Sequence, residues 1–508
     1  MRIYFSEHKT AVIFIVSTLC ISFAFTGCTD EFLSPNPETT STSANFFEKE
    51  DHFRQSVNGA YASLQDWVLQ AHVLLEGRSD NTTFDNGLNR GVLRSNLRID
   101  VFVTRSDEPE IGNAWNTIYS GIKDINLPLS ELESAVERGI LGSDLASRLE
   151  GELKFLRGYF YFTAVRLWGN IPLIAEPFTT GLSTFEIEQS PKEEVFNTII
   201  QDLQDAESLL PESYEVSNLG RPTSWAAKAL LAKVYLRRDE YVNAEEKLSE
   251  IITSGQFSLL QDYGSIFDPQ NKFNSEIIYS VPFKQGSEGE SSNFIFQFAP
   301  VGSFPEVIPT LVGDGTWGRN LPTWQLVNQY EDGDSRKNAS VGIYRPDGDS
   351  IPYVKKWDEA TSEEFARTDH NWPLIRYADV LLMMSEAINE QGGRLPDALT
   401  YVNQIRNRAG LSDTTASGQE ILRDIILHER RIELAFENQR WFDLVRSEKA
   451  IERMRNHGNK LRKNPPTQYT QTTPLPDNAF KMEDFMTIYP IPQNELIAND
   501  NMNQNPGY

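Results

Sequence analysis

The chain has 508 residues, of which 39% are hydrophobic and 23% are charged, a composition typical of a folded globular protein with room for more than one domain. Its formal net charge of −25 argues against nucleic-acid binding, which needs a basic surface, and favours a neutral ligand over an anionic one. The only two cysteines lie within the first thirty residues, which excludes a cysteine zinc site, a cysteine nucleophile or a disulfide framework further along the chain.

The first 27 residues have the pattern of a signal peptide. Basic residues precede an apolar run at 11–25, which is too short to cross a bilayer comfortably, although an uncleaved anchor helix is the alternative. The run ends in FTGC, which resembles a bacterial lipobox. That resemblance implies cleavage before Cys28 and acylation of Cys28, giving a stable lipid anchor. The acidic residues that follow at 29–31 resemble the signal that sends such lipoproteins to the outer cell surface.

A tether and a series of long amphipathic helices follow in chain order. Residues 33–45 are rich in Pro, Ser and Thr, so we assign residues 28–45 to a lipid tether. Helical periodicity predicts helices over 47–67, 110–135 and 143–168. A further helix should begin at SPKE, with Ser190 as its cap and a proline in the first turn, and run to residue 210.

Two later stretches each contain a pair of helices. Residues 221–257 and 376–410 each place two helical patterns within about 34 residues, the repeat length of tetratricopeptide units. Small residues such as Ala226 and Ala244 occur where two helices must approach closely. Gly392-Gly393 should end the first helix of the second pair. Such pairs are scaffolds that stack on neighbouring helices to bury their apolar faces.

The composition and periodicity of the sequence change over residues 283–375 and 455–508. Both segments are rich in Gly, Pro, Asn and aromatic residues and show little periodicity. Long irregular segments inside a compact protein are either functional or disordered. Because these keep many aromatic residues, we expect ordered loops that carry the functional site.

The sequence GDGTWG at 313–318 fits the dinucleotide pattern G-x-G-x-x-G. That pattern needs a helix directly after it, and Pro322 blocks a helix at the required place. We therefore expect no cofactor, and we interpret the segment as a loop that presents Trp317 to solvent. Trp357 also lies in loop-like sequence, whereas Trp324 should start a helix that packs inward.

The sequence HERRIE at 428–433 begins like a zinc-protease motif but lacks the second histidine, so we expect no metal there. Glu429, Glu433 and Glu437 recur every four residues with arginines between them. Paired carboxylates could hydrolyse a glycoside. Carboxylates on one helix beside arginines more often form ion pairs, which is the interpretation we favour.

A polar loop at 80–87, DNTTFDNG, contains one aromatic residue. It is either a solvated turn or part of a sugar site, which needs an aromatic platform together with polar side chains. Asp80, Asn81 and Phe84 are therefore candidate ligand-binding residues, together with Trp317 and Trp357.

Several stretches together resemble the SusD/RagB family. In chain order they are FEKEDHFRQSVNGAY, LRGYFYFTAVRLWGNIPLI, RPTSWAAKALLAKVYL, WPLIRYADVLLMMSEAIN, HERRIELAFENQRWFDLVR and YPIPQNELIANDNMNQNPGY. The last is the most specific, and the resemblance covers nearly the whole chain after the signal peptide. It implies a mostly α SusD-like fold, with tetratricopeptide-like helix pairs and long irregular ligand-binding loops. The parts would be residues 46–270 and 271–508, packed as one compact unit.

The resemblance also implies a function. Such proteins are lipid-anchored to the outer membrane, face the cell exterior and act as the lid of a SusC-like TonB-dependent barrel. They are not enzymes, and they capture nutrients, mostly oligosaccharides. Asp80 and Asn81 match a loop that family members often use, and Trp317 precedes Pro322-Thr323, where a stacking aromatic is common. A peptide-binding or purely scaffolding surface lipoprotein is the alternative, and a glycosidase built on residues 428–446 is the third hypothesis.

Overall fold

A computed structural model of the chain describes residues 46–84, 95–177, 187–286, 290–308, 315–346, 348–358, 362, 364–463 and 475–508. The predicted signal peptide, Cys28 and the tether lie outside these residues. The chain divides into two compact units, Met1–Phe53 and Arg54–Tyr508. In the described part of the first unit, the ring of Phe47 contacts those of Phe46 and Phe53.

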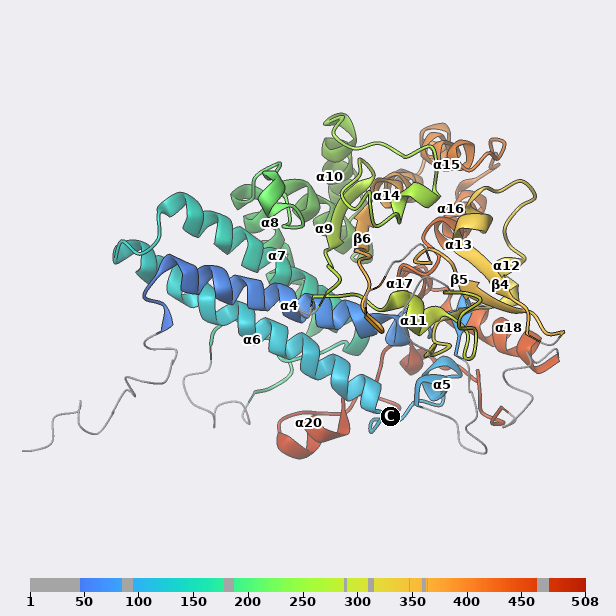
Figure 1. Cartoon of the computed structure of the whole chain (residues 1–508), viewed down its shortest axis with the longest axis horizontal. Coiled ribbons are helices and arrows are strands. Elements are labelled where there is room, and N and C mark those ends of the chain that lie inside the picture. The colour runs from blue at the N-terminus through green and yellow to red at the C-terminus, as the bar shows by residue number, and fades with distance from the viewer. Residues whose placement is uncertain are drawn as a thin grey trace, which may run out of the picture. The chain divides into compact units, whose positions relative to one another are not determined.

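The second unit is built mainly from helices that pack on one another in chain order (Figure 1). α6 packs on α7, α7 on α8, α8 on α9, α9 on α10, and α10 on α14, which also contacts α15 and α16. The bounds of the longer helices are α4 Glu50–Leu74, α6 Pro109–Glu137, α7 Ser143–Trp168, α8 Lys192–Leu209, α9 Ser224–Arg237, α10 Tyr241–Thr253, α14 Tyr377–Gln391, α15 Leu395–Arg408, α16 Gln419–Glu433, α17 Arg440–Arg446 and α18 Ala450–Lys463.

Both predicted helix pairs are confirmed. They are α9 with α10 and α14 with α15, and each pair packs directly together. Ala226 and Ala244 are fully buried, as expected for small residues where helices approach closely. Gly392 follows the end of α14 with φ of 74°, in the left-handed region that glycine adopts without strain. The mostly α fold follows from this stack of helices.

Two details of the helix boundaries differ from the prediction. Ser190 does not cap α8: its backbone N–H donates to the Ile171 carbonyl, and the Asn170 side chain accepts from the first N–H of the helix, that of Lys192 (3.0 Å). The N–H at the start of α8 is therefore bound by Asn170, which lies twenty positions before Ser190. The segment after 455, predicted to be irregular, begins with the helix α18, which extends to Lys463.

Short strands and helices connect the helical layer to the irregular segments. Three antiparallel pairs form: β1 (Thr82–Thr83) with β3 (Leu321–Pro322), β2 (Ile277–Val281) with β6 (Trp372–Arg376), and β4 (Val341–Tyr344) with β5 (Ile351–Val354). The register is Thr82↔Pro322, Val281↔Trp372 and Val341↔Val354. The short helices are α5 Ser95–Asp100, α11 Phe294–Phe298, α12 Trp324–Val327, α13 Arg336–Ser340 and α20 Gln493–Ala498. The pairs β1–β3 and β2–β6 tie segments that are about 100 residues or more apart in the chain.

A network of buried ion pairs joins α16 to these segments. Glu433 contacts Arg336 (3.1 Å), Arg376 (3.1 Å) and Arg408. Glu276 contacts the same Arg376 (2.7 Å) and Arg408 (3.2 Å). All five side chains are buried. Burial alone would raise the pKa of Glu433, but the three arginines outweigh it and hold that pKa well below its ordinary range.

The structure confirms that Glu429, Glu433 and Glu437 form ion pairs. Glu429 contacts Arg336, and Glu437 contacts Lys356 (2.6 Å) and Arg376 (2.7 Å). One part of the prediction is wrong, because residues 428–446 do not form one helix. α16 ends at Glu433, and Glu437 lies in a turn in which Phe436 and Asn438 have φ of 69° and 62°. The turn rather than the helical repeat brings Glu437 into the network.

We predict that Glu433→Gln strongly destabilises the protein. The change leaves the buried guanidinium groups of Arg336, Arg376 and Arg408 short of one negative charge. The free energy of unfolding should fall by about 3–5 kcal/mol, measured by urea denaturation. The matched control is Glu420→Gln at the exposed start of the same helix, where the change should stay within about 1 kcal/mol. Equal effects of the two variants would contradict the importance of the network.

The protein should lose stability in acid through carboxylates such as Asp379. Burial alone would raise the pKa of Asp379, but Lys233 and Arg430 lower it to about 2. The folded pKa lies below the unfolded one, so this stabilisation is complete above about pH 4 and is lost as the pH falls towards 2. Between pH 5 and pH 3 the unchanged protein should lose about 1 kcal/mol more than Asp379→Asn. The exposed control, Asp397→Asn, should lose as much stability between pH 5 and pH 3 as the unchanged protein. An equal loss in all three proteins would contradict a role for Asp379 in the acid sensitivity.

Candidate functional site

Two partly exposed aromatic side chains lie beside Gly315. A Cβ atom placed on Gly315 would lie 2.9 Å from Cζ of Phe365 and 3.8 Å from Nε1 of Trp317, so both rings lie next to this residue. The Phe365 side chain is 44% exposed, and Trp317 is half-buried. We call Trp317 and Phe365, with Gly315 between them, the aromatic platform. Its existence depends on glycine at 315, because a larger residue would occupy the space between the rings.

Backbone hydrogen bonds hold both sides of the platform on α11. On one side the N–H groups of Trp317 and Gly318 donate to the carbonyls of Phe296 (2.9 Å) and Ala299 (2.9 Å). On the other side Ser292 and Thr368 exchange backbone hydrogen bonds of 2.9 and 2.7 Å just before α11 begins. The buried ring of Phe296 lies under that of Phe365, edge to face, with centroids 5.2 Å apart. The two rings of the platform are therefore positioned by the same short helix.

Arg319 adds a cation over the Trp317 ring of the platform. Its guanidinium lies 5.3 Å from the centroid of the Trp317 ring and donates to Oε1 of Gln297 (3.2 Å). Gln297 in turn donates to the Leu69 carbonyl of α4 (2.9 Å). Burial, together with the positive charge of Arg319, lowers the pKa of the nearby His72 to about 3, so His72 is neutral at physiological pH.

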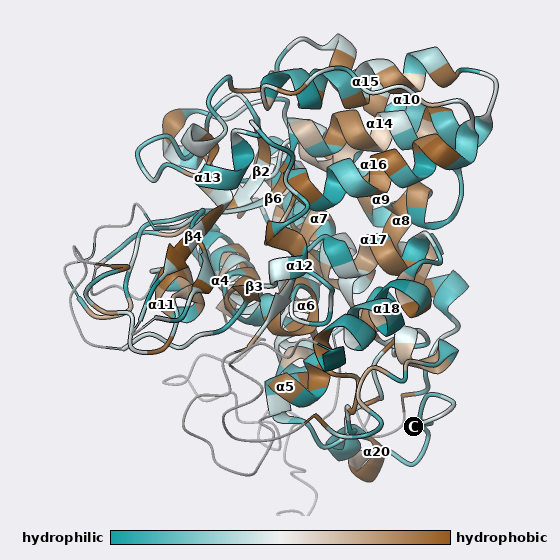
Figure 2. Cartoon of the chain, turned by 90° about the vertical axis from the view of Figure 1, so that its right-hand side faces the viewer, coloured by the Kyte–Doolittle hydropathy of each residue, from teal (hydrophilic) through white to brown (hydrophobic). Residues whose placement is uncertain are grey.

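The platform has the chemistry to bind a polar ligand that also has apolar faces. Aromatic rings stack against flat or weakly polar surfaces such as sugar rings, and the arginine supplies N–H donors for hydroxyl groups. Figure 2 shows α11 and β4 on one side of the view and α10, α14, α15 and α16 on the other. The platform thus lies among the irregular segments, as predicted for a site carried by loops.

Asp80 and Asn81 are buried and bind other parts of the chain. The Asp80 carboxylate accepts from Arg440 (2.8 and 3.1 Å) and pairs with Arg431 (3.1 Å). Burial alone would raise the pKa of Asp80, but these two arginines hold it well below its ordinary range. Asn81 donates to Glu76 (2.8 Å) and accepts from Arg431 (2.8 Å). Because their polar atoms are used internally, we do not include Asp80 and Asn81 in the candidate site.

Phe84 and Trp357 are also in the core. Phe84 is 1% exposed, and its ring lies directly over Gly77, 2.4 Å from where a Cβ atom would be. Trp357 is fully buried and stacks on Trp372, with ring centroids 4.7 Å apart and an interplanar angle of 4°. Neither ring is accessible to a ligand at the surface, so neither is included. Residues 85–87 of the predicted polar loop lie outside the described residues.

The two remaining tryptophan predictions have different outcomes. Trp317 lies at the surface, in the irregular segment where the sequence placed it. Trp324 does begin the helix α12, capped by Thr323, but the expectation that it packs inward is wrong. Its side chain is 41% exposed, whereas Leu326 and Val327 of the same helix are buried.

Sequence reasoning missed Phe365 and Arg319. Phe365 is a single aromatic residue in the polar sequence SEEFARTD, and Arg319 follows Trp317 by two positions. A search for aromatic residues isolated in polar, aperiodic sequence could have found Phe365. Its proximity to Trp317 depends on the Ser292–Thr368 pairing, which no local pattern indicates.

No helix among the described residues is long and apolar enough to span a bilayer. The same residues contain no group of three or more His, Cys, Asp or Glu side chains arranged to hold a metal ion.

Comparison with known proteins adds the family. A model described as "SusD family" matches residues 313–508, and one described as "Starch-binding associating with outer membrane" matches residues 31–236. A SusD-like protein of Formosa agariphila is 26% identical over 98% of this chain and 100% of its own length. A solved "Laminarin binding SusD-like protein" is 25% identical, with a TM-score of 0.73, over 91% of this chain and 100% of its own.

A second solved structure shows how closely the fold is shared. A SusD homolog from Bacteroides thetaiotaomicron superposes with a TM-score of 0.79 over 93% of this chain and 100% of its own, at 22% identity. The two matched family models together span most of the chain, and the relatives match along nearly their whole length. The chain therefore belongs to the SusD/RagB family.

Proposed function

We propose that this chain is a glycan-binding lipoprotein of the cell surface. Cys28 carries the lipid that anchors it in the outer membrane, facing the exterior. The folded part acts as the lid of a SusC-like TonB-dependent barrel and captures oligosaccharides for import. It has no catalytic role, in keeping with a family whose members are binding proteins rather than enzymes.

The observation that carries the proposal is the aromatic platform. Phe365 is 44% exposed, Trp317 is half-buried beside it, and the Arg319 guanidinium lies over the Trp317 ring, 5.3 Å from its centroid. A shallow site of this kind suits the stacking of one or two sugar rings and should bind in the micromolar to millimolar range. The relative that binds laminarin, a glucan, supports glycans over peptides as the ligand class.

The anchor and the barrel rest on different observations. The FTGC sequence ending at Cys28 supports acylation, and the family model described as associating with the outer membrane supports the location. The helices α6 to α10 and α14 to α16, which pack on one another, support contact with a large protein partner (Figure 1).

The carboxylates of α16 do not support the glycosidase hypothesis. A glycosidase needs two carboxyl groups facing a cleft about 5–10 Å apart. Glu429, Glu433 and Glu437 are buried and paired with arginine or lysine. Their geometry is that of a structural ion-pair network.

We predict that Trp317→Ala abolishes or strongly weakens glycan binding. Residues 29–508, without the anchor, would be run through native gels containing a panel of polysaccharides. One polysaccharide should retard the unchanged protein, and the variant should lose at least about tenfold in affinity, because the stacking surface is gone. Retardation unaffected by the variant would keep glycan binding but place the site elsewhere. No retardation by any polysaccharide would favour the peptide-binding or scaffolding alternative.

Phe365→Ala should weaken binding to the same polysaccharide. The matched control is Phe273→Ala, since Phe273 is 41% exposed but has no part in the platform. Phe365 lies beside Gly315, so its loss removes half of the stacking surface, whereas the control should bind like the unchanged protein. Equal behaviour of both variants in the gels would contradict a role for Phe365.

We predict that Asp80→Asn acts on stability rather than on binding. The change leaves Arg440 and Arg431 without a buried counter-ion, so the free energy of unfolding should fall by about 3–5 kcal/mol in urea denaturation. The exposed Asp413→Asn is the control and should change stability little. If Asp80→Asn were as stable as the unchanged protein but had lost glycan retardation, Asp80 would instead be a ligand residue.

A further inference from the structure

Cationic side chains converge on a cavity of about 30 Å³ in the helical layer. The cavity lies between the last turns of α7 and α9 and the helices α14, α16 and α17. The charged residues in its lining are Arg166, Lys233, Arg237, Arg430, Arg446 and Asp443. In a chain with a net charge of −25, five cations around one small cavity are unexpected.

Carboxylates neutralise part of this charge. Asp443 accepts from Arg430 (2.9 Å) and from Arg446 (2.9 Å). Arg430 and Lys233 also contact Asp379, and Arg446 contacts Glu386. Among the described residues, these three carboxylates pair with three of the five cations, Lys233, Arg430 and Arg446. The other two, Arg166 and Arg237, form no direct ion pair, and the negative charges of Asp239 and Glu193 act on Arg237 from further away.

Neither Arg166 nor Arg237 is in direct contact with a carboxylate. Arg166 donates Nε–H to the Phe162 carbonyl (2.8 Å), and its guanidinium lies 3.7 and 3.6 Å from the ring centroids of Phe162 and Phe442. The Arg237 side chain makes no hydrogen bond and no ion pair to any other residue that the structure describes. Burial, with the positive charges of Arg237 and Arg446, lowers the pKa of Arg166 to about 9.

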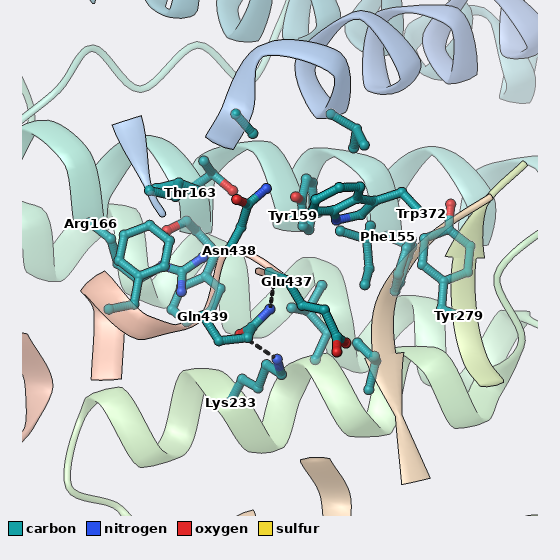
Figure 3. A pocket seen from close by; sticks show the side chains of 18 residues that line it. Phe155, Tyr159, Thr163, Arg166, Lys233, Tyr279, Trp372, Glu437, Asn438 and Gln439 are labelled. Carbon is teal, nitrogen blue, oxygen red and sulfur yellow. Dashed lines mark hydrogen bonds between the residues drawn. The ribbon is translucent and has the colours of Figure 1, made fainter. Parts of the chain in front are cut away.

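A second small cavity adjoins the first. It measures about 40 Å³ and shares Arg166, Lys233 and Gln439 with the first cavity (Figure 3). Asn438 and Tyr279 line it, both more than nine-tenths buried, and Oδ1 of Asn438 and the Tyr279 hydroxyl have no hydrogen-bond partner among the described residues. Such polar surroundings suit ordered water, which could hydrate an ion in the neighbouring cavity.

We propose that the first cavity binds a small monovalent anion of the size of chloride, held by Arg166 and Arg237. A cavity of about 30 Å³ has room for one such ion, since a water needs about 10–15 Å³ measured in the same way. Half-buried charges attract each other more strongly than charges in water, and an uncompensated buried charge is costly. The site is independent of glycan binding, because all its residues belong to the helical layer and none to the aromatic platform.

Helix ends offer a second explanation for these arginines. Arg166 and Arg237 lie in the last turns of α7 and α9, where the helix dipole favours a cation. The helix dipole accounts for one arginine at the end of each helix. It does not explain why Arg166 and Arg237 line the same cavity as Arg446. The two explanations predict opposite effects of removing a cation when no anion is present.

The test compares melting temperatures in sodium chloride and in sodium gluconate at equal ionic strength, gluconate being too large for the cavity. The protein is residues 29–508, and the variants are Arg237→Met and, as a control, the exposed Arg345→Met. The unchanged protein and the control should melt higher in chloride, and the difference should rise with chloride concentration and saturate. Arg237→Met should melt alike in both salts and, in gluconate, at least as high as the unchanged protein.

Several results would overturn the anion site. One is an equal melting temperature of the unchanged protein in both salts. Another is a chloride effect that persists in Arg237→Met, which would be a bulk salt effect. A loss of stability in Arg237→Met that is the same in both salts would assign Arg237 to the helix end alone. In crystals soaked in sodium bromide, an anomalous peak should lie between Arg166 and Arg237, and its absence would also refute the proposal.

Discussion

The buried ion pairs around Glu433 fix how the irregular segments sit on the helices. Glu433 lies on α16, and its arginines come from α13, from the end of β6 and from α15. Removing any one partner would leave a charge buried and uncompensated, so the arrangement forms as a whole or not at all. A segment held by hydrophobic contacts alone could shift its register by one residue. A segment whose arginine shares a carboxylate with two other guanidinium groups cannot shift without breaking ion pairs. The network therefore determines where the loop segments begin.

The same principle explains why Asp80 and Asn81, which the sequence suggested as ligand residues, are buried and bound to other parts of the chain. Asp80 binds Arg440 and Arg431, and its backbone carbonyl accepts from the Thr323 hydroxyl (2.9 Å). These contacts hold β1 against β3, directly after the segment that carries Trp317. In this fold the buried carboxylates and arginines form structural ion pairs, whereas Trp317 and Phe365 are partly exposed.

The sequence predicted the helices well because helical periodicity is a local property. The bounds of α7 and the two helix pairs follow from apolar spacing and from helix-ending glycines such as Gly392. Partners distant in the chain could not be predicted. Lys356 and Trp357 look like exposed loop sequence, yet Lys356 is paired with Glu437, and Trp357 is buried against Trp372 and other aromatic rings. Trp317 and Trp357 both lie in loop-like sequence, and only long-range contacts make one partly exposed and the other buried.

The ion pair between Asp80 and Arg440 joins residues 360 positions apart, which constrains the order of folding. A chain made from its N-terminus has the Asp80 segment complete long before Arg440 exists, so this carboxylate cannot be buried at that stage without a large electrostatic cost. The early helices α6 to α10 contact neighbours in the chain and can pack as they appear. Helix α4 and the loop after it cannot reach their final packing until the last quarter of the chain has been made. The surface that carries Trp317 is therefore among the last parts of the molecule to become ordered.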